Sequence, residues 1–161
     1  MTVPAPVRDL ALLVARLAVG LVFFAHGWQK LFTNGIDGTA AFLDQVGVPA
    51  ATAAAWFAAV VELAGGAALI LGLAVPVAGL LLLVDMIGAF AFVHAGAGLF
   101  VEQGGSELVL TLGAAALLLA VTGAGRYGVD HLLLDRRRTA HRLGAESAPS
   151  GEDTAVLRPA A

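Results

Sequence analysis

Ionisable side chains stand inside apolar stretches of this chain, where hydrocarbon would not solvate them. They are Arg16, His26, Lys30, Glu62, Asp85 and His94. A charged side chain at the centre of a bilayer costs about 2.5–3.5 kcal/mol on insertion scales, so such groups normally face the interior of a helical bundle and find partners there. Cationic donors, carboxyls and imidazoles grouped in this way are able to hold a polar headgroup, exchange protons or ligate a haem iron.

The candidate polar site comprises His26, Lys30, Glu62 and Glu107. His26 and Lys30 are one helical turn apart, so both reach one carbonyl oxygen from the same side. Lysine then acts as a cationic donor, and histidine as a donor that also takes or releases a proton. Glu62 lies on the next apolar stretch and is expected to hold a proton or balance the positive charge. Glu107 opens the last stretch at the same end. No metal site is expected.

A second polar layer is predicted nearer the end of the bundle at which the first apolar stretch begins. We expect Arg16 to form a structural ion pair there with Asp85, with Glu62 as the alternative partner. The planar guanidinium suits a buried pair because it binds both oxygens of a carboxylate. His94 follows Asp85 by nine positions, about 900° of rotation, which puts the two on opposite faces of an unbroken α-helix. One of them is therefore expected to face away from the bundle, or the helix is broken near Gly96.

Four apolar stretches must position these groups, at about 10–32, 50–74, 76–98 and 107–124. Each has the roughly 20 residues that a helix needs to cross a hydrocarbon core of about 30 Å. The predicted fold class is therefore all-α, an integral membrane four-helix bundle. The turn before Pro76 is short, so the second and third helices are expected to be antiparallel neighbours, which gives an up-down-up-down topology.

Composition supports a membrane protein independently of these residues. The chain is 59% hydrophobic and only 13% charged, with a mean hydropathy of +0.88, whereas soluble domains are about 25% charged. The four stretches predict one domain at 7–134, followed by a polar cytoplasmic tail at 135–161 whose composition favours disorder. Cysteine is absent, which excludes disulfides and thiolate redox or metal sites in this chain. The charges are not gathered into a basic face, so no nucleic-acid partner is expected.

The basic residues outside the apolar stretches predict the orientation. Arg8 precedes the first stretch, and Arg126 and further arginines follow the last one. The connections 33–49 and 95–106 contain no lysine or arginine. By the positive-inside tendency both termini are predicted to be cytoplasmic.

Small residues recur at helical spacing on three of the stretches and predict helix contact faces. The first face is Arg16, Gly20, Phe23, Gly27 and Lys30; the second is Ala55, Ala58, Glu62, Gly66 and Leu69; the last is Glu107, Thr111, Ala114 and Leu118.

Several of these motifs together resemble the DoxX family over about residues 8–130. They are the runs 16–20 and 26–30, Glu62-Leu-Ala-Gly-Gly66, Leu71-Gly-Leu73, Met86 with Ala89 and His94, and the closing run 123–130. The family often has proline at Ala124 and serine at Gly128, and both departures concern a turn. The resemblance implies a small multi-pass protein of the bacterial inner membrane that is linked to redox metabolism. It also implies contact with a quinone, or anchoring of a soluble oxidoreductase or sulfur-handling enzyme.

Three classes of function follow. The first is a quinone-contacting or scaffolding membrane subunit without its own metal. In this class the candidate polar site hydrogen-bonds a quinone headgroup. The second is a proton-coupled small transporter or channel that uses Glu62 and Asp85 as carriers. The third is a haem b protein with His26 and His94 as axial ligands. The lipid bilayer is the expected environment in each class, and a homo-oligomer is compatible with such a small bundle.

Overall fold

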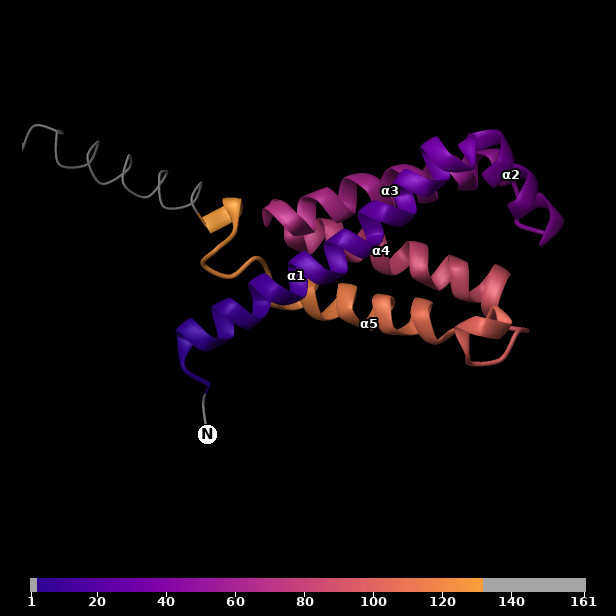
Figure 1. Ribbon diagram of the computed structural model, residues 1–161. Coiled ribbons are helices and arrows are strands. Elements are labelled where there is room, and N and C mark those ends of the chain that lie inside the picture. Colours follow the sequence, from indigo (N-terminus) through magenta and orange to yellow (C-terminus); the bar gives the residue numbers. More distant parts are fainter. Residues whose placement is uncertain (1–2, 132–161) are drawn as a thin grey trace, which may run out of the picture. The chain divides into compact units, whose positions relative to one another are not determined.

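The computed structural model describes residues 3–131, in which helices are joined by turns and short connections and no β-strand occurs (Figure 1). Its α-helices are α1 (Ala5–Trp28), α2 (Gly35–Gln45), α3 (Ala51–Leu71), α4 (Val75–Ala89) and α5 (Glu107–Thr122). One π-helical segment, η1 (Gln29–Thr33), continues α1, and a second, η2 (Phe90–His94), continues α4; a short 3-10 turn, η3 (Val101–Gln103), precedes α5. The all-α prediction is confirmed. The predicted tail at 135–161 lies outside the described residues.

Three helical segments are long and apolar enough to cross a membrane. They are Ala5–Thr33, Ala51–Leu71 and Val75–His94. The fourth predicted stretch forms α5, which is apolar but has only 16 residues. The first three predicted stretches therefore correspond to helices of spanning length, and the fourth is a shorter apolar helix.

The helices pack in the order α1 on α3, α3 on α4 and α4 on α5, and α2 lies against α3 (Figure 1). The core between them contains Phe23 from α1, Leu69 from α3, Leu82 from α4 and Leu119 from α5, all almost fully buried. Large apolar side chains also cover the outward faces of the helices. Such a surface suits hydrocarbon contact, because lipid tails are as apolar as the side chains themselves.

Glycines bring α1 and α3 into backbone contact. A methyl group on Gly66 would lie 2.7 Å from the carbonyl oxygen of Gly20, and one on Gly27 would lie 2.9 Å from that of Ala59. Helices approach this closely only where side chains are absent from the interface. The predicted contact faces of the first two apolar stretches are therefore present, with Arg16, Gly20, Phe23 and Gly27 buried on α1.

The predicted contact face of the last stretch is wrong. Thr111, Ala114 and Leu118 are exposed, and the buried face of α5 is formed by Leu112, Gly113, Ala116, Leu119 and Ala120. Gly79 of α4 packs against this face, where an added methyl group would lie 2.7 Å from the carbonyl oxygen of Ala116. Because α5 is apolar on every side, its sequence does not distinguish the core face from the opposite one.

The connection predicted at 33–49 contains a helix of its own. α2 buries Thr39 and Ala40 and exposes Phe42. The chain leaves it through Gly47 and then Ala50, whose φ of 52° is left-handed. This connection therefore covers one end of α3 with an ordered element.

Gly27→Ala tests the close contact between α1 and α3. An alanine normally stabilises a helix relative to glycine by about 1 kcal/mol. Here the added methyl group meets the backbone of Leu63, so we expect a loss of about 1–3 kcal/mol, as for other overpacked sites. The control is Gly38→Ala on α2, where the nearest atom, Asn34 Cβ, would be 3.9 Å away. Thermal unfolding in detergent should show a lower midpoint for the first variant only; equal midpoints would contradict the contact.

Candidate functional site

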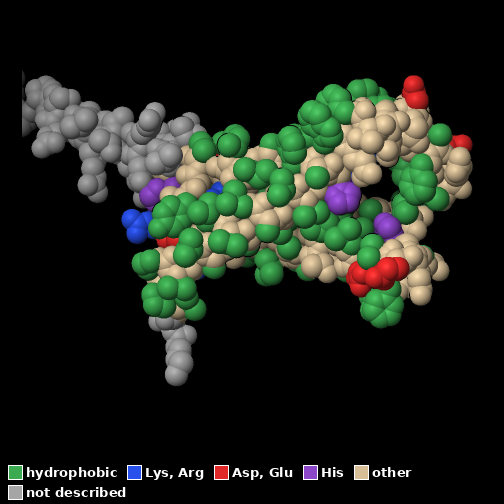
Figure 2. Space-filling model, in the orientation of Figure 1, with side chains coloured by type: hydrophobic (Ala, Val, Ile, Leu, Met, Phe, Trp, Pro, Cys, Tyr) green, Lys and Arg blue, Asp and Glu red, His purple; other side chains and the backbone are tan. Residues whose placement is uncertain are grey.

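A cavity of about 460 Å³ opens at the end of the bundle where α2 lies, and Figure 2 shows a hollow beside histidine side chains on this part of the surface. Its apolar walls include Phe42 and Leu43 of α2, Phe57 of α3 and Phe92 of η2. Its polar lining comprises Gln29, Lys30, Asn34, Thr39, Glu62, Asp85 and His94. An apolar cavity with a few converging polar groups is the usual form of a small-molecule site.

The ion pair of Lys30 with Glu62 is the central polar contact of this cavity. Lys30 Nζ donates to Glu62 Oε2 at 2.5 Å, and the two side chains are 24% and 4% exposed. Asp85 is buried and lines the same cavity, and its carboxyl interacts electrostatically with Glu62 and Lys30. The structure thus brings together residues from α3, α4 and the end of α1. Two carboxyls face one ammonium group.

The π-helical segment η1 positions Lys30. Within it the amide of Asn34 donates to the carbonyl oxygen of Gln29, five residues back, at 2.8 Å. Thr39 of α2 is buried, and its hydroxyl lies 3.2 Å from the carbonyl oxygen of Lys30 and 3.0 Å from that of Gly35. No role for Thr39 is predicted from the sequence, because its contact depends on a helix in a segment expected to be a loop. π-helical turns are frequent at functional sites.

His94 lines the same cavity as Asp85, although an unbroken α-helix would place them on opposite faces. The cause is η2, where the amide of Ala95 donates to the carbonyl oxygen of Phe90, five residues back, at 2.8 Å. A π-helical turn holds more residues than an α-helical one, so it rotates each residue by less than 100°. His94 Nδ1 is fixed by a 2.7 Å hydrogen bond with the carbonyl oxygen of Gly104.

The other two members of the predicted polar site do not line the cavity. His26 makes a hydrogen bond through Nδ1 with the carbonyl oxygen of Val22, one turn earlier on α1, at 2.9 Å. Glu107 Oε1 accepts from the amide of Val101 at 2.9 Å and so fixes the connection before α5. The structure therefore brings Lys30 and Glu62 together, adds Asp85 and His94, and leaves His26 and Glu107 outside.

The expected ion pair of Arg16 with Asp85 is not formed, and the alternative partner, Glu62, is paired with Lys30. Arg16 is fully buried and donates to the carbonyl oxygens of Leu69 at 3.4 Å and Tyr127 at 3.1 Å. Asp130 is the acid that contributes to its electrostatic environment. Asp85 lies instead with Glu62 near the cavity, more than two turns further along the bundle. Arg16 donates from its two terminal nitrogens to carbonyl oxygens of α3 and of the segment after α5, and its buried Nε has no hydrogen-bond partner among the described residues.

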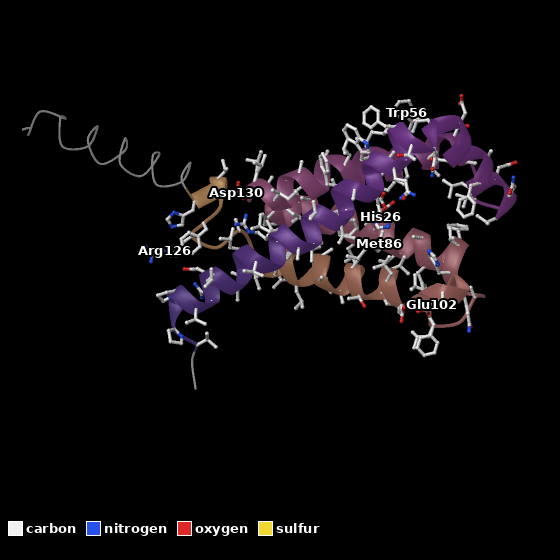
Figure 3. The ribbon with its side chains drawn as sticks, viewed as in Figure 1. His26, Trp56, Met86, Glu102, Arg126 and Asp130 are labelled. Atoms are coloured by element: carbon white, nitrogen blue, oxygen red, sulfur yellow. The ribbon has the colours of Figure 1, made fainter. Side chains whose placement is uncertain are left out.

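The segment after α5 closes the end of the bundle opposite the cavity. Asp130 accepts hydrogen bonds from the amides of Ala74 at 2.9 Å and Val75 at 3.4 Å, and so caps the N-terminus of α4. Its own amide donates to the carbonyl oxygen of Gly72 at 3.1 Å. Arg126 is exposed nearby, at the opposite end from Glu102 (Figure 3). Capping of one helix by such a distant aspartate has no local sequence signal.

Comparison with known proteins identifies the family of this chain. The DoxX family model matches residues 11–95, including Arg16, Lys30, Glu62 and Asp85. The chain belongs to the DoxX family. No solved structure matches it.

Relatives of this DoxX protein are membrane proteins of several bacteria. The uncharacterized membrane protein Rv3486 of Mycobacterium tuberculosis is 36% identical over 78% of this chain and 82% of its own. The inner membrane protein YqjF of Escherichia coli is 34% identical over 78% of this chain and 94% of its own. The protein named "Putative oxidoreductase CatD" in Bacillus subtilis is 29% identical over 83% of this chain and 94% of its own.

Arg16→Leu tests the corrected partners of this arginine. The substitution removes donors from the Leu69 and Tyr127 carbonyl oxygens, and we expect it to destabilise the protein by about 2 kcal/mol. Adding Asp85→Leu should give no rescue, because the two side chains do not interact. Unfolding of the single and double variants in detergent forms a mutant cycle, with Arg126→Leu at an exposed site as the control. A coupling energy above about 1 kcal/mol between the two substitutions would contradict these partners and support the Arg16–Asp85 ion pair.

Proposed function

We propose that this DoxX protein is a redox-associated subunit of the bacterial inner membrane that binds a quinone-type headgroup in its cavity. The observation that carries the proposal is the pair of buried carboxyls, Glu62 and Asp85, with the partly buried Lys30 at an apolar-walled cavity. Charged side chains at membrane depth are costly and usually serve a substrate or proton site. The printed name of the Bacillus subtilis relative, which refers to an oxidoreductase, points the same way.

The chemistry of the cavity suits a flat ring that carries oxygen atoms. Lys30 Nζ is able to donate to a ligand oxygen beside Glu62, and the carboxyls of Glu62 and Asp85 accept hydrogen bonds or exchange a proton. Phe42, Phe57 and Phe92 supply apolar and aromatic wall area for the ring. These residues bind and orient the ligand. Electron transfer belongs to the ligand and to a soluble redox or sulfur-handling partner.

We further propose four membrane crossings in up-down-up-down order, with both termini in the cytoplasm. Arg126 lies at one end of the described part and Glu102 at the other (Figure 3), and on the visible face the Lys and Arg side chains gather at the first end while most Asp and Glu side chains gather at the second (Figure 2). The positive-inside tendency then assigns the basic end to the cytoplasm. α5 is shorter than the other spans, with about 24 Å of helix, and local bilayer thinning accommodates such a mismatch. The cavity opens on the non-cytoplasmic side.

A proton-coupled transporter is the second candidate, favoured by the buried carboxyls of Glu62 and Asp85. Liposomes that contain the protein and a pH-sensitive dye distinguish the transporter from the ligand-binding subunit. Only a transporter dissipates an imposed proton gradient when its substrate is present. The haem b alternative is not carried forward, because it needs two histidines at one site and His26 does not line the cavity.

Single cysteines test the proposed orientation, and the chain has no cysteine of its own. Asp37→Cys and Arg126→Cys place thiols at exposed positions on the two ends. In intact cells an impermeant maleimide should label the first and leave the second unlabelled until the membrane is permeabilised. Labelling of both in intact cells would contradict the topology.

Glu62→Gln and Asp85→Asn test the ligand site. Each removes a carboxylate while keeping its size, so the protein should still accumulate in the membrane. Binding of a short-chain benzoquinone analogue, measured by equilibrium dialysis in nanodiscs, should weaken about tenfold or more, the loss expected for a buried hydrogen bond to a charged group. Glu102→Gln is the matched control, because Glu102 is exposed and outside the cavity. Unchanged binding in both cavity variants would refute the assignment.

A further inference from the structure

His94 offers a ligand one defined hydrogen-bonding atom. Its ring lines the cavity, and its Nδ1 lies 2.7 Å from the carbonyl oxygen of Gly104. A carbonyl oxygen only accepts, so in the neutral ring Nδ1 carries the hydrogen and Nε2 has a free lone pair. The group that His94 presents to the cavity is therefore an acceptor, and the bond to Gly104 holds the ring in that tautomer.

Acceptors predominate among the charged and imidazole groups that line the cavity, and the amides of Gln29 and Asn34 both donate and accept. Glu62 and Asp85 contribute carboxyl oxygens, and His94 contributes Nε2. Lys30 is the only cationic donor among the described lining residues, and one of its N–H groups is already used by Glu62. The Thr39 hydroxyl is directed to backbone carbonyls. A ligand that brings its own donors would satisfy more of these atoms than a ligand that only accepts.

We propose that the cavity selects the reduced, dihydroxy form of a quinone over the oxidised dione, with His94 Nε2 accepting from one hydroxyl and the Lys30–Glu62–Asp85 group engaging the other. This inference rests on the proposed function and specifies the redox state of the bound ligand. Both forms are neutral and almost equal in size, so the apolar walls contribute equally to the binding of each. The difference arises at His94, where a hydroxyl donates and a carbonyl oxygen would face a lone pair.

Selection of this kind changes the reduction potential of the bound ligand. If the reduced form binds ten times more tightly than the oxidised form, the midpoint potential of the bound couple rises by about 30 mV, the value for a tenfold change in a two-electron couple. The bound ligand is then easier to reduce than the free one. The site would retain the product of a quinone-reducing partner.

The experiment measures two affinities for one ring system. Full-length protein in nanodiscs is dialysed, without oxygen, against tetramethyl-1,4-benzoquinone and against its hydroquinone. The tetrasubstituted ring resists addition by lysine. We expect the hydroquinone to bind about tenfold more tightly, the effect of one hydrogen bond gained in place of an unpaired acceptor. His94→Phe should remove the preference by lowering hydroquinone affinity. His26→Phe should keep it, because His26 has the same type of backbone hydrogen bond outside the cavity.

His94→Gln provides a second variant that retains polarity. Its amide can donate as well as accept, so the affinity for the dione should rise towards that for the hydroquinone. Equal affinities in the unmodified protein, tighter binding of the dione, or a preference that survives in both His94 variants would overturn this inference. In those cases, the proposed function stands if both forms bind and Glu62→Gln weakens them. Binding of neither form would overturn both proposals.

Discussion

A charged side chain is costly in hydrocarbon unless polar groups surround it, and this cost explains where Arg16 and Lys30 of this protein lie. At one end Arg16 donates to the carbonyl oxygens of Leu69 and Tyr127. Lys30 is satisfied at the other end by Glu62. Phe23 is two turns from each of these cations on α1 and is almost fully buried. The bundle thus has two polar ends that an apolar layer separates, and each end requires a segment from outside the long helices: the closing segment for Arg16 and α2 for Lys30.

The polar pair at the cavity depends in turn on the glycine contact between α1 and α3. Gly27 precedes Lys30 by about one turn, and Leu63, which its backbone approaches, is next to Glu62. A side chain at Gly27 would therefore separate the two helices where the ion pair forms. Thr39 then holds the carbonyl oxygen of Lys30 from α2. Small residues that look like simple packing elements thus set the distance between a cation and its counterion.

The sequence predicted what hydrophobic length and strong periodicity determine: the helical class, the first three spans and the glycine faces of α1 and α3. It did not predict features that depend on tertiary contacts. The π-helical turn at η2 moves His94 to the side of Asp85. No local residue pattern predicts this turn. The partners of Arg16 are backbone carbonyls, which every residue possesses. The contact face of α5 was misassigned because both faces carry small apolar residues. The grouping of Lys30 with Glu62 was predicted, because the cation on one apolar stretch needs a carboxylate to balance its charge and Glu62 lies on the next stretch.

The position of the cavity bears on the choice between a binding subunit and a transporter. Transport requires access to the polar group from both sides of the membrane in turn. Between the cavity and Arg16 lie Phe23, Leu69 and Leu82, each at most 1% exposed, on three different helices. Opening that layer would require separating α1 from α3, whose backbones are in contact at Gly20 and Gly66. Interfaces packed this closely resist gradual deformation. A cavity separated from Arg16 by such a layer suits a protein that binds a ligand and presents it to a partner, which favours the redox-associated subunit over the transporter.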